Sequence, residues 1–310
     1  MPRHITVATR TATLFLTMTL VCVCTLAQSR DKASVIEIPF EFYRNEIILQ
    51  VRVDGKGPFN MMLDTGTDPS AIELTTAREL GLKLIPLGSP PVGGGNAPRQ
   101  VYGVFLQLVE VGGITIRNLE SVAIDLSKIS ERIGKPIQGV LGHSLLKGRI
   151  VQIDYPKRIV RFYSQSPFAK MPKQANTPTH TVLPFRYVDN VLIDDVLVNG
   201  KKMTANFDTG SNGTFDLTPA AVIYLGMEEE VNRAPTSSDV GYNGVAENKK
   251  GELSNVTIGG ILVAGAPVTF FAKGTGRDKK PWGINIGNEF LKDFVVTIDY
   301  RSKLLTLEKP

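Results

Sequence analysis

Two aspartates stand in matched settings in this 310-residue chain, and side chains so placed could act together as an acid and a base. The motifs are Asp64-Thr65-Gly66 and Asp208-Thr209-Gly210, each behind an apolar run and each followed by a hydroxyl residue, Thr67 or Ser211. Two carboxylates at hydrogen-bond distance cannot both ionise cheaply, so one pKa rises strongly and one proton is shared. The charged member could activate a water while the protonated member polarises a carbonyl group. This chemistry requires no metal, no cofactor and no covalent intermediate.

The residues beside each aspartate suit a close approach of two such loops. Glycine lets the backbone turn tightly and come near its counterpart, and this role falls to Gly66 and Gly210. Threonine and serine hydroxyls both donate and accept hydrogen bonds. We therefore expect Thr65 and Thr209 to bond across the interface, and Thr67 and Ser211 to donate to a carboxylate.

The second motif lies 144 residues after the first, and other segments repeat at nearly the same offset. The pairs are Ile38–Phe40 with Leu183–Phe185, Val111–Ile114 with Ile258–Ile261, Leu141–Lys147 with Ile286–Lys292, and Val151–Tyr155 with Val296–Tyr300. Collinear landmarks at a constant spacing indicate an internal repeat, here about as long as a small domain. The two aspartates should therefore come from two similar units.

The elements that must position the aspartates are mainly strands. Runs of alternating apolar and polar residues at 47–53 and 191–198 end in Asp54-Gly55 and Asn199-Gly200, which are hairpin turn signals. The returning strands, 59–63 and 203–207, lead into the motifs. A short helix should follow each motif, over 75–80 and 218–225, because each stretch begins with a hydroxyl residue and is closed by a glycine. The predicted fold class is mainly β.

A stretch with three prolines and little apolar periodicity, residues 166–181, separates the two halves and reads as a linker. We expect one β-rich lobe over 34–165 and a second over 182–310. Each lobe is long enough to bury a core of its own.

Residues 1–27 are typical of a signal peptide. Arg3 and Arg10 precede an apolar stretch without acidic residues, and Thr25-Leu26-Ala27 offers a small-residue cleavage site. An uncleaved membrane anchor is the alternative, although the apolar stretch is short for spanning a bilayer.

Both cysteines of the chain, Cys22 and Cys24, fall inside this segment, so the cleaved chain would have no disulfide. Export without disulfides points to a bacterial envelope more than to a eukaryotic secretory product. We therefore expect an exported protein that is periplasmic, envelope-associated or secreted. A lipid tether on Cys22 is a second alternative, but Val21 is bulkier than a lipoprotein cleavage site usually accepts.

Several other classes of chemistry find no support in the sequence. The formal net charge of +5 is mild and spread along the chain, which gives no reason to expect a nucleic-acid partner. His143 and His180 are isolated, and without cysteines in the mature chain nothing assembles a zinc site. A serine-hydrolase Gly-x-Ser-x-Gly motif is absent from the sequence. We expect His143 to be a loop residue and Trp282 to serve ordinary packing near the cleft.

The chain resembles the aspartic proteases, in which Asp-Thr-Gly followed by Ser, Thr or Ala marks each active-site loop. The resemblance includes the apolar-apolar-Gly element later in each half, Val140-Leu141-Gly142 and Asn285-Ile286-Gly287, the second with Asn at its first apolar position. It implies two similar β-rich lobes with a substrate cleft between them. It also implies a catalytic pair, Asp64 and Asp208, with Thr65 and Thr209 as a grip between the lobes. The short halves are closest in style to the bacterial retropepsin-like group.

The same resemblance implies a β-hairpin flap over the cleft, and two segments could supply it. Residues 90–96 followed by Tyr102-Gly103 occupy the expected place in the first lobe. The segment Val240-Gly241-Tyr242-Asn243-Gly244 occupies the equivalent place in the second lobe. A solvated hairpin without substrate contact stays open for each.

The predicted function is an exported aspartic endopeptidase that acts on polypeptide substrates as a monomeric pseudo-dimer, without metal or nucleic acid. Because Thr67 and Ser211 can stabilise an ionised carboxylate, we expect an acidic pH optimum. A non-catalytic protein that binds peptide or an envelope partner in the same cleft is the alternative. Pairing of lobes between two chains, in place of pairing within one, also stays open.

Overall fold

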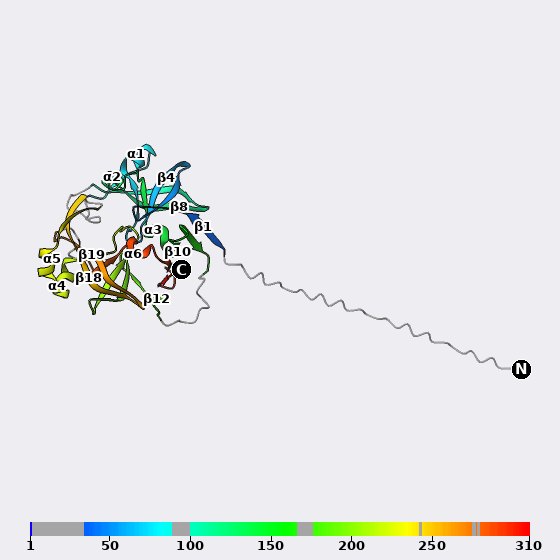
Figure 1. The fold of residues 1–310 in the computed structure, drawn as a ribbon. Helices are drawn as coiled ribbons and strands as arrows, with labels where there is room; N and C mark the ends of the chain where they lie inside the picture. The colour runs from blue at the N-terminus through cyan, green and yellow to red at the C-terminus, as the bar shows by residue number, and fades with distance from the viewer. Residues whose placement is uncertain (2–33, 89–99, 166–175, 242–243, 275–276, 278–279) are drawn as a thin grey trace. The chain divides into compact units, whose positions relative to one another are not determined.

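Each copy of the repeat forms a six-stranded β-barrel in the computed structural model (Figure 1). The described residues are Met1, 34–88, 100–165, 176–241, 244–274, Arg277 and 280–310. The predicted signal peptide, the first flap loop at 90–96 and Tyr242 lie outside these residues. The chain divides into two units, Met1–Lys32 and Ala33–Pro310, and the barrels, the joining sheet and the cavity belong to the second.

The first barrel is closed by a pairing between its first and last strands. In order around the barrel its strands are β3 (Glu46–Val53), β4 (Lys56–Leu63), β9 (Gly139–Leu141), β5 (Ser70–Glu73), β8 (Ile114–Ile124) and β7 (Tyr102–Val111). Pairing of β7 with β3 completes the circle. Two short strands, β2 (Glu41–Tyr43) and β6 (Ile85–Pro86), extend it at the edges.

The second barrel repeats this order strand for strand. It consists of β14 (Val191–Val198), β15 (Lys201–Phe207), β20 (Ile284–Ile286), β16 (Phe215–Leu217), β19 (Ile261–Phe270) and β18 (Gly244–Ile258), closed by the pairing of β18 with β14. The edge strands are β13 (Arg186–Tyr187) and β17 (Thr236–Gly241). The predicted fold class, mainly β with two similar lobes from an internal duplication, is confirmed.

A third sheet joins the two halves, which the sequence did not lead us to expect. Its strand order is β1 (Val35–Pro39), β11 (Ile159–Tyr163), β10 (Ile150–Asp154), β21 (Val295–Asp299), β22 (Leu304–Glu308) and β12 (His180–Pro184). At its centre β10 of the first half runs antiparallel to β21 of the second, and the Gln152 side chain donates to the Thr297 hydroxyl. Strand β12 begins at His180, inside the stretch expected to be linker.

The hairpins that lead into each motif follow directly from their turn residues. Asp54 and Gly55 have φ of 51° and 75°, and Asn199 and Gly200 have 47° and 77°. Two successive residues with positive φ form the tight turn that matches the twist of paired strands, and Asp-Gly and Asn-Gly are the dipeptides that favour it. Both predicted hairpins are present, as β3–β4 and β14–β15.

The helices are short and lie at the ends of strands. Helix α4 (Pro219–Leu225) has Thr218 as its N-cap and Gly226 in the left-handed conformation after it, as predicted. Helix α1 (Leu74–Glu79) begins one residue before the predicted start at Thr75, and its N-cap is the Glu73 side chain. The helices that were not predicted are α2 (Ser127–Ile133), α3 (His143–Leu146), α5 (Glu228–Arg233) and α6 (Asn288–Leu291).

One large apolar cluster runs through both barrels and the joining sheet. It contains Val51 and Leu63 of the first barrel, Phe207 of the second, and Ile153 and Ile298 of the joining sheet. The halves therefore share a core, whereas the sequence suggested one core each.

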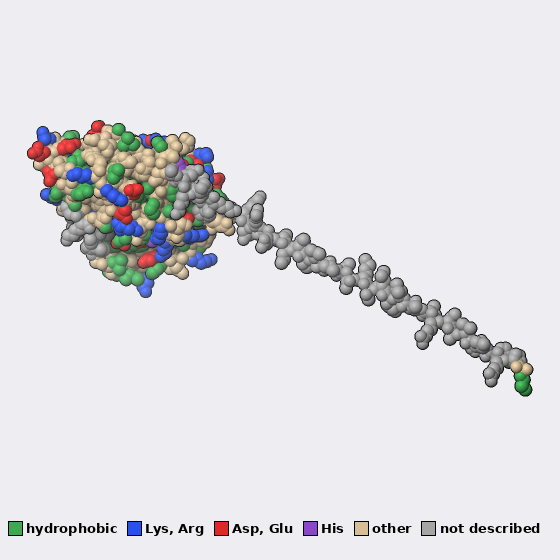
Figure 2. Space-filling model, turned by 90° about the horizontal axis from the view of Figure 1, so that it is seen from below, with side chains coloured by type: hydrophobic (Ala, Val, Ile, Leu, Met, Phe, Trp, Pro, Cys, Tyr) green, Lys and Arg blue, Asp and Glu red, His purple; other side chains and the backbone are tan. Residues whose placement is uncertain are grey.

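On the outer face seen in Figure 2, basic and acidic side chains are interspersed with apolar ones. Among the described residues, no helix combines the length and apolar character needed to span a membrane.

Candidate active site

Each motif aspartate directly follows a central barrel strand, and its backbone is tied to the strand beside it. Asp64 follows β4 and its N–H donates to the Leu141 carbonyl of β9 at 3.0 Å. Asp208 follows β15 and its N–H donates to the Ile286 carbonyl of β20, also at 3.0 Å. The apolar-apolar-Gly elements found in the sequence are thus the strands that hold the two aspartate loops in place.

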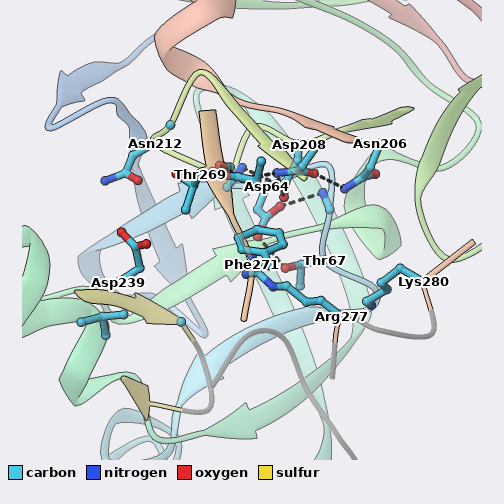
Figure 3. Close-up of a pocket in the computed structure, with 18 of the residues that line it drawn as sticks. Asp64, Thr67, Asn206, Asp208, Asn212, Asp239, Thr269, Phe271, Arg277 and Lys280 are labelled. Atoms are coloured by element: carbon cyan, nitrogen blue, oxygen red, sulfur yellow. Dashed lines mark hydrogen bonds between the residues drawn. The ribbon is translucent and has the colours of Figure 1, made fainter. Parts of the chain in front are cut away.

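The two loops approach each other so closely that only glycine fits between them. A Cβ atom added to Gly66 would lie 2.6 Å from Oδ1 of Asp208, and one added to Gly210 would lie closer still to the Asp64 carboxyl group. Real Cβ atoms do not approach other atoms this closely. The two predicted catalytic carboxylates therefore face each other across the boundary between the barrels, as Figure 3 also shows.

Thr65 and Thr209 form a reciprocal set of four hydrogen bonds between the barrels. Each backbone N–H donates to the hydroxyl of the other threonine at 3.0 Å. The Thr65 hydroxyl donates to the Phe207 carbonyl and the Thr209 hydroxyl to the Leu63 carbonyl, both at 2.9 Å. Both threonines are fully buried, so these bonds fix the relative position of the two aspartate loops.

The two aspartates accept the same kind of hydrogen bond at Oδ1 and different hydrogen bonds at Oδ2. Oδ1 of each aspartate accepts from the backbone of the motif glycine, Gly66 at 2.7 Å or Gly210 at 2.9 Å. Oδ2 of Asp64 accepts from the Thr67 hydroxyl at 2.5 Å, as expected. Oδ2 of Asp208 accepts from the side-chain amide of Asn285 at 3.1 Å.

Ser211, the counterpart of Thr67, does not serve Asp208. Its hydroxyl donates to Oδ2 of Asp216 at 3.2 Å. The Ser211 hydroxyl thus bonds to the carboxylate of Asp216, a second acidic side chain within its reach, in place of the carboxylate of Asp208.

The surroundings of Asp208 favour its protonated form. Burial raises the pKa of Asp208 well above its ordinary value, and the neighbouring Asp64 carboxylate raises it further. The N–H of Gly210, the Asn285 amide and Arg277 act in the opposite direction. The two carboxylates thus have different environments, which is the condition for one to act as acid and the other as base.

A cavity of about 380 Å³ opens over the pair (Figure 3). The first barrel contributes Met62 and Thr67, and α2 contributes Ile129 and Arg132. Most of the remaining wall comes from the second barrel and includes Asn206, Ser211, Asp216, Asp239, Lys250, Thr269, Phe271, Arg277, Lys280 and Asn285. Both lobes therefore contribute apolar and polar side chains to the wall, and most of the polar ones come from the second lobe.

The two flap candidates differ in what the structure describes. Tyr102 pairs with Pro86 and Ala123, packs against the main core and does not line the cavity. In the second lobe, Val240 and Gly241 at the end of β17 do line the cavity. Val240 also packs against the apolar cluster around α2 of the first lobe, so this hairpin reaches across from one lobe to the other.

Trp282 and His143, for which the sequence predicted no role in catalysis, both pack against other aromatic residues. Trp282 lines the cavity but is only 7% exposed and packs with Leu192 and Phe271. His143 is the first residue of α3, not a loop residue. Its ring stacks on Tyr187 with a centroid distance of 3.7 Å, and its Nδ1 lies 3.1 Å from Asp68.

A buried ion pair beside the catalytic pair was missed in the sequence. Glu46 is fully buried and its Oε1 accepts from Arg132 at 2.7 Å. Burial raises the pKa of Glu46 to about 8, against the lowering effect of Arg132. The signal was an acidic residue directly before the apolar run Ile47–Leu49, which gives no indication of its partner on α2.

Comparison with known proteins agrees with the motifs. Residues 49–145 match the family model described as Aspartyl protease. The chain is also similar to a crystal structure of a retropepsin-like aspartic protease from Rickettsia conorii, at 19% identity and a TM-score of 0.34. That match covers 42% of this chain and 90% of the other. No curated protein matches the chain. The resemblance to the aspartyl protease family is therefore confirmed, with the family match carried by residues 49–145, which include the first Asp-Thr-Gly motif.

Proposed function

We propose that the protein is an aspartic endopeptidase in which Asp64 and Asp208 hydrolyse peptide bonds. The observation that carries this proposal is the meeting of the two carboxylates, one from each barrel, on the wall of a single cavity. A family match alone would be compatible with a lobe that had lost activity. Two intact motifs held by a buried grip argue for a working pair.

The different surroundings of the carboxylates support different roles for them. Asp64, with the Thr67 hydroxyl and the Gly66 N–H donating to it, is the carboxylate that takes a proton from the attacking water. Asp208 gives its proton to the carbonyl oxygen of the substrate as the C–O bond to water forms. The tetrahedral intermediate then returns a proton to Asp208, the C–N bond breaks, and Asp64 passes the proton taken from water to the leaving nitrogen.

The position of the cavity supports the proposal that the substrate is a polypeptide in an extended conformation. The cavity lies at the boundary of the two lobes. The end of β17 in the second lobe and helix α2 of the first lobe lie next to each other on its wall. A chain threaded between these elements would place one peptide bond over the carboxylates. Closure around that bond would also exclude water other than the nucleophile.

We further propose that the protein is exported and acts as a single-chain pseudo-dimer. Export rests on residues 1–27, whose basic start, apolar centre and small-residue end are those of a signal peptide. Action within one chain rests on the joining sheet and the threonine grip, which unite both lobes of the same chain.

The test is peptide cleavage by the mature chain and by Asp64→Asn and Asp208→Asn. Each variant should lose at least about 10³-fold in kcat/KM while keeping its unfolding temperature, since each removes a group that transfers protons. Asp195→Asn is the matched control, because Asp195 is exposed and lies away from the cavity, 3.6 Å from Lys202. Inhibition by pepstatin should accompany cleavage.

Retained activity in either aspartate variant would exclude the shared-proton mechanism. Peptide binding without cleavage in the unaltered chain at any pH from acid to neutral would favour the alternative, a binding protein on the same fold.

A further inference from the structure

The two barrels differ in chemistry at three equivalent positions next to the catalytic pair. In the first barrel Met62, Val140 and Ala71 lie side by side on β4, β9 and β5. In the second barrel the same register places Asn206, Asn285 and Asp216 on β15, β20 and β16. Three apolar side chains thus correspond to three polar ones, although the strands around them are arranged alike.

The apolar set has an evident packing role. Met62, Val140 and Ala71 belong to a cluster with Ile129 and Ile133 of α2, so that helix covers them. The polar set lies on the cavity wall. Its members are nevertheless 2% to 7% exposed, and burying polar groups is unfavourable unless they are hydrogen-bonded.

The polar set forms one hydrogen-bond network centred on Asn285. The Asn206 amide donates to Oδ1 of Asn285 at 2.6 Å. The Asn285 amide donates to Oδ2 of Asp216 and to Oδ2 of the catalytic Asp208, both at 3.1 Å. The bond from Asn206 and the bond to Asp216 fix the plane of the Asn285 amide, so that its amide group is also aimed at Asp208.

Ser211 completes this network at the far end. Its hydroxyl donates to Asp216 at 3.2 Å, whereas Thr67 at the equivalent position donates to Asp64 at 2.5 Å. A side-chain hydrogen bond therefore reaches each of the two carboxylates, but the donors differ. In the second barrel an amide takes the place of the motif hydroxyl.

We propose that Asn285, held in position by Asn206 and Asp216, stabilises the Asp208 carboxylate that forms when Asp208 gives its proton to the substrate. A donor fixed before the reaction costs no reorganisation when charge develops, which makes such groups effective in enzyme sites. Asn285, Asn206 and Asp216 are positioning residues, since they act on the substrate only through Asp208. This inference rests on the proposed function.

The charged groups around the network are those expected to influence its titration. Asp208 is subject to Asp64, Arg277 and the Gly210 N–H. Asp216 is subject to Arg277, Asp239 and Lys250. None of these is changed by substitution of Asn285, so a change in the titration of Asp208 would report the loss of the amide donor.

The first experiment compares peptide cleavage by Asn285→Val, which installs the residue of the first barrel, with cleavage by the unaltered chain. We expect kcat to fall by roughly 10- to 100-fold, as for loss of one hydrogen bond to a charged group, with KM changed less than threefold. The alkaline limb of the pH–rate profile should move to higher pH, because the amide lowers the pKa of Asp208. Asn255→Val, the same substitution on β18 outside the cavity wall, should change neither.

Asn285→Val also removes a hydrogen-bond donor from the buried Asp216 carboxylate, which destabilises the fold. A second variant separates this effect from the loss of the donor to Asp208. Replacing all three residues by those of the first barrel, Asn206→Met with Asp216→Ala and Asn285→Val, removes that problem. It also frees Ser211 to turn towards Asp208, so kcat should recover in part relative to Asn285→Val. A kcat within threefold of the unaltered chain in Asn285→Val, with an unmoved pH profile, would overturn the proposal.

A readout without turnover separates this inference from the proposed function. Carbon-13 NMR of the aspartate carboxyls follows the titration of Asp208 in the unaltered chain and in Asn285→Val. A higher Asp208 pKa in the variant supports the amide donor even in a chain that cleaves nothing, whereas identical titrations overturn it. An inactive unaltered chain would contradict the proposed function and leave the donor role decided by this titration.

Discussion

Thr67 and Ser211 occupy the same place after their motifs but donate to different carboxylates. The sequence predicted one role for both, because a hydroxyl three residues after an aspartate can reach it. Whether it does so depends on competing acceptors, and Asp216 exists only in the second copy. Position-by-position comparison of the two repeats would have revealed this difference, as it revealed Asn285.

The two hydroxyls should therefore differ in their importance for catalysis. We expect Thr67→Ala to lower kcat/KM by roughly 10- to 100-fold, since Asp64 loses a direct donor. Ser211→Ala should cost several-fold less, because its bond to Asp208 is absent and only the support of Asp216 is weakened. Steady-state kinetics on one peptide measure both. Thr67→Ser keeps the hydroxyl and should retain activity, and equal losses in the two alanine variants would contradict the asymmetry.

The pH dependence of activity also belongs to single residues. Catalysis requires a proton on Asp208, so activity falls as pH rises through the pKa of that group. Because burial and Asp64 raise this pKa above the ordinary 3.8, the alkaline limb should lie well above pH 3.8. Activity should therefore persist on the alkaline side of the acidic optimum that the sequence predicts. A kcat/KM profile from pH 3 to 9 measures this. Complete loss of activity by pH 5, with the chain still folded, would contradict it.

At the scale of elements, the strands and turns that lead into each aspartate were predictable, whereas helix α2 on the wall of the cavity was not. Residues such as Asn199 and Gly200 encode their turn locally, through a backbone conformation that few residues adopt. Helix α2 has this kind of signal at one end only, since Gly134 closes it in the left-handed conformation but its N-cap Leu126 makes no side-chain hydrogen bond. Its position depends on burying Ile129 and Ile133 against a barrel face formed by distant strands.

The proposed catalytic residues were likewise accessible from the sequence, whereas the residues that support them were not. Asp64 and Asp208 are marked by a repeated tripeptide, and the threonine grip follows from it. Asn206, Asp216 and Glu46 carry no motif, because their roles arise from contacts between strands far apart in the chain. The flap remains a prediction, since residues 90–96 and Tyr242 lie outside the described residues.

At the scale of the whole molecule, the two halves are joined by shared structure more than by their linker. Strand β10 pairs with β21, the threonines bond between the barrels, and Asn288 of the second half donates to Asn45 of the first at 2.7 Å. One apolar cluster includes residues from both halves. Burial of this kind makes unfolding cooperative.

We therefore expect the chain from residue 33 onward to unfold in a single transition as a monomer. Residues 33–165 and 176–310, expressed separately, should each fail to give a native near-ultraviolet circular dichroism spectrum, because each loses half of the joining sheet. Calorimetry with light scattering measures the first expectation and spectroscopy the second. Two resolved transitions, or an independently folded half, would show that the lobes are separate domains.

Covalent fusion of the two copies has a consequence for how such a site can change over time. In a protease assembled from two identical chains, one genetic substitution alters both halves at once, so a residue useful beside one aspartate is forced on the other. Here β10 and β21 hold two separately encoded copies together. An asparagine, Asn285, could therefore occupy this position in the second copy while the first copy kept Val140. In this way Asp64 and Asp208 could acquire different neighbours.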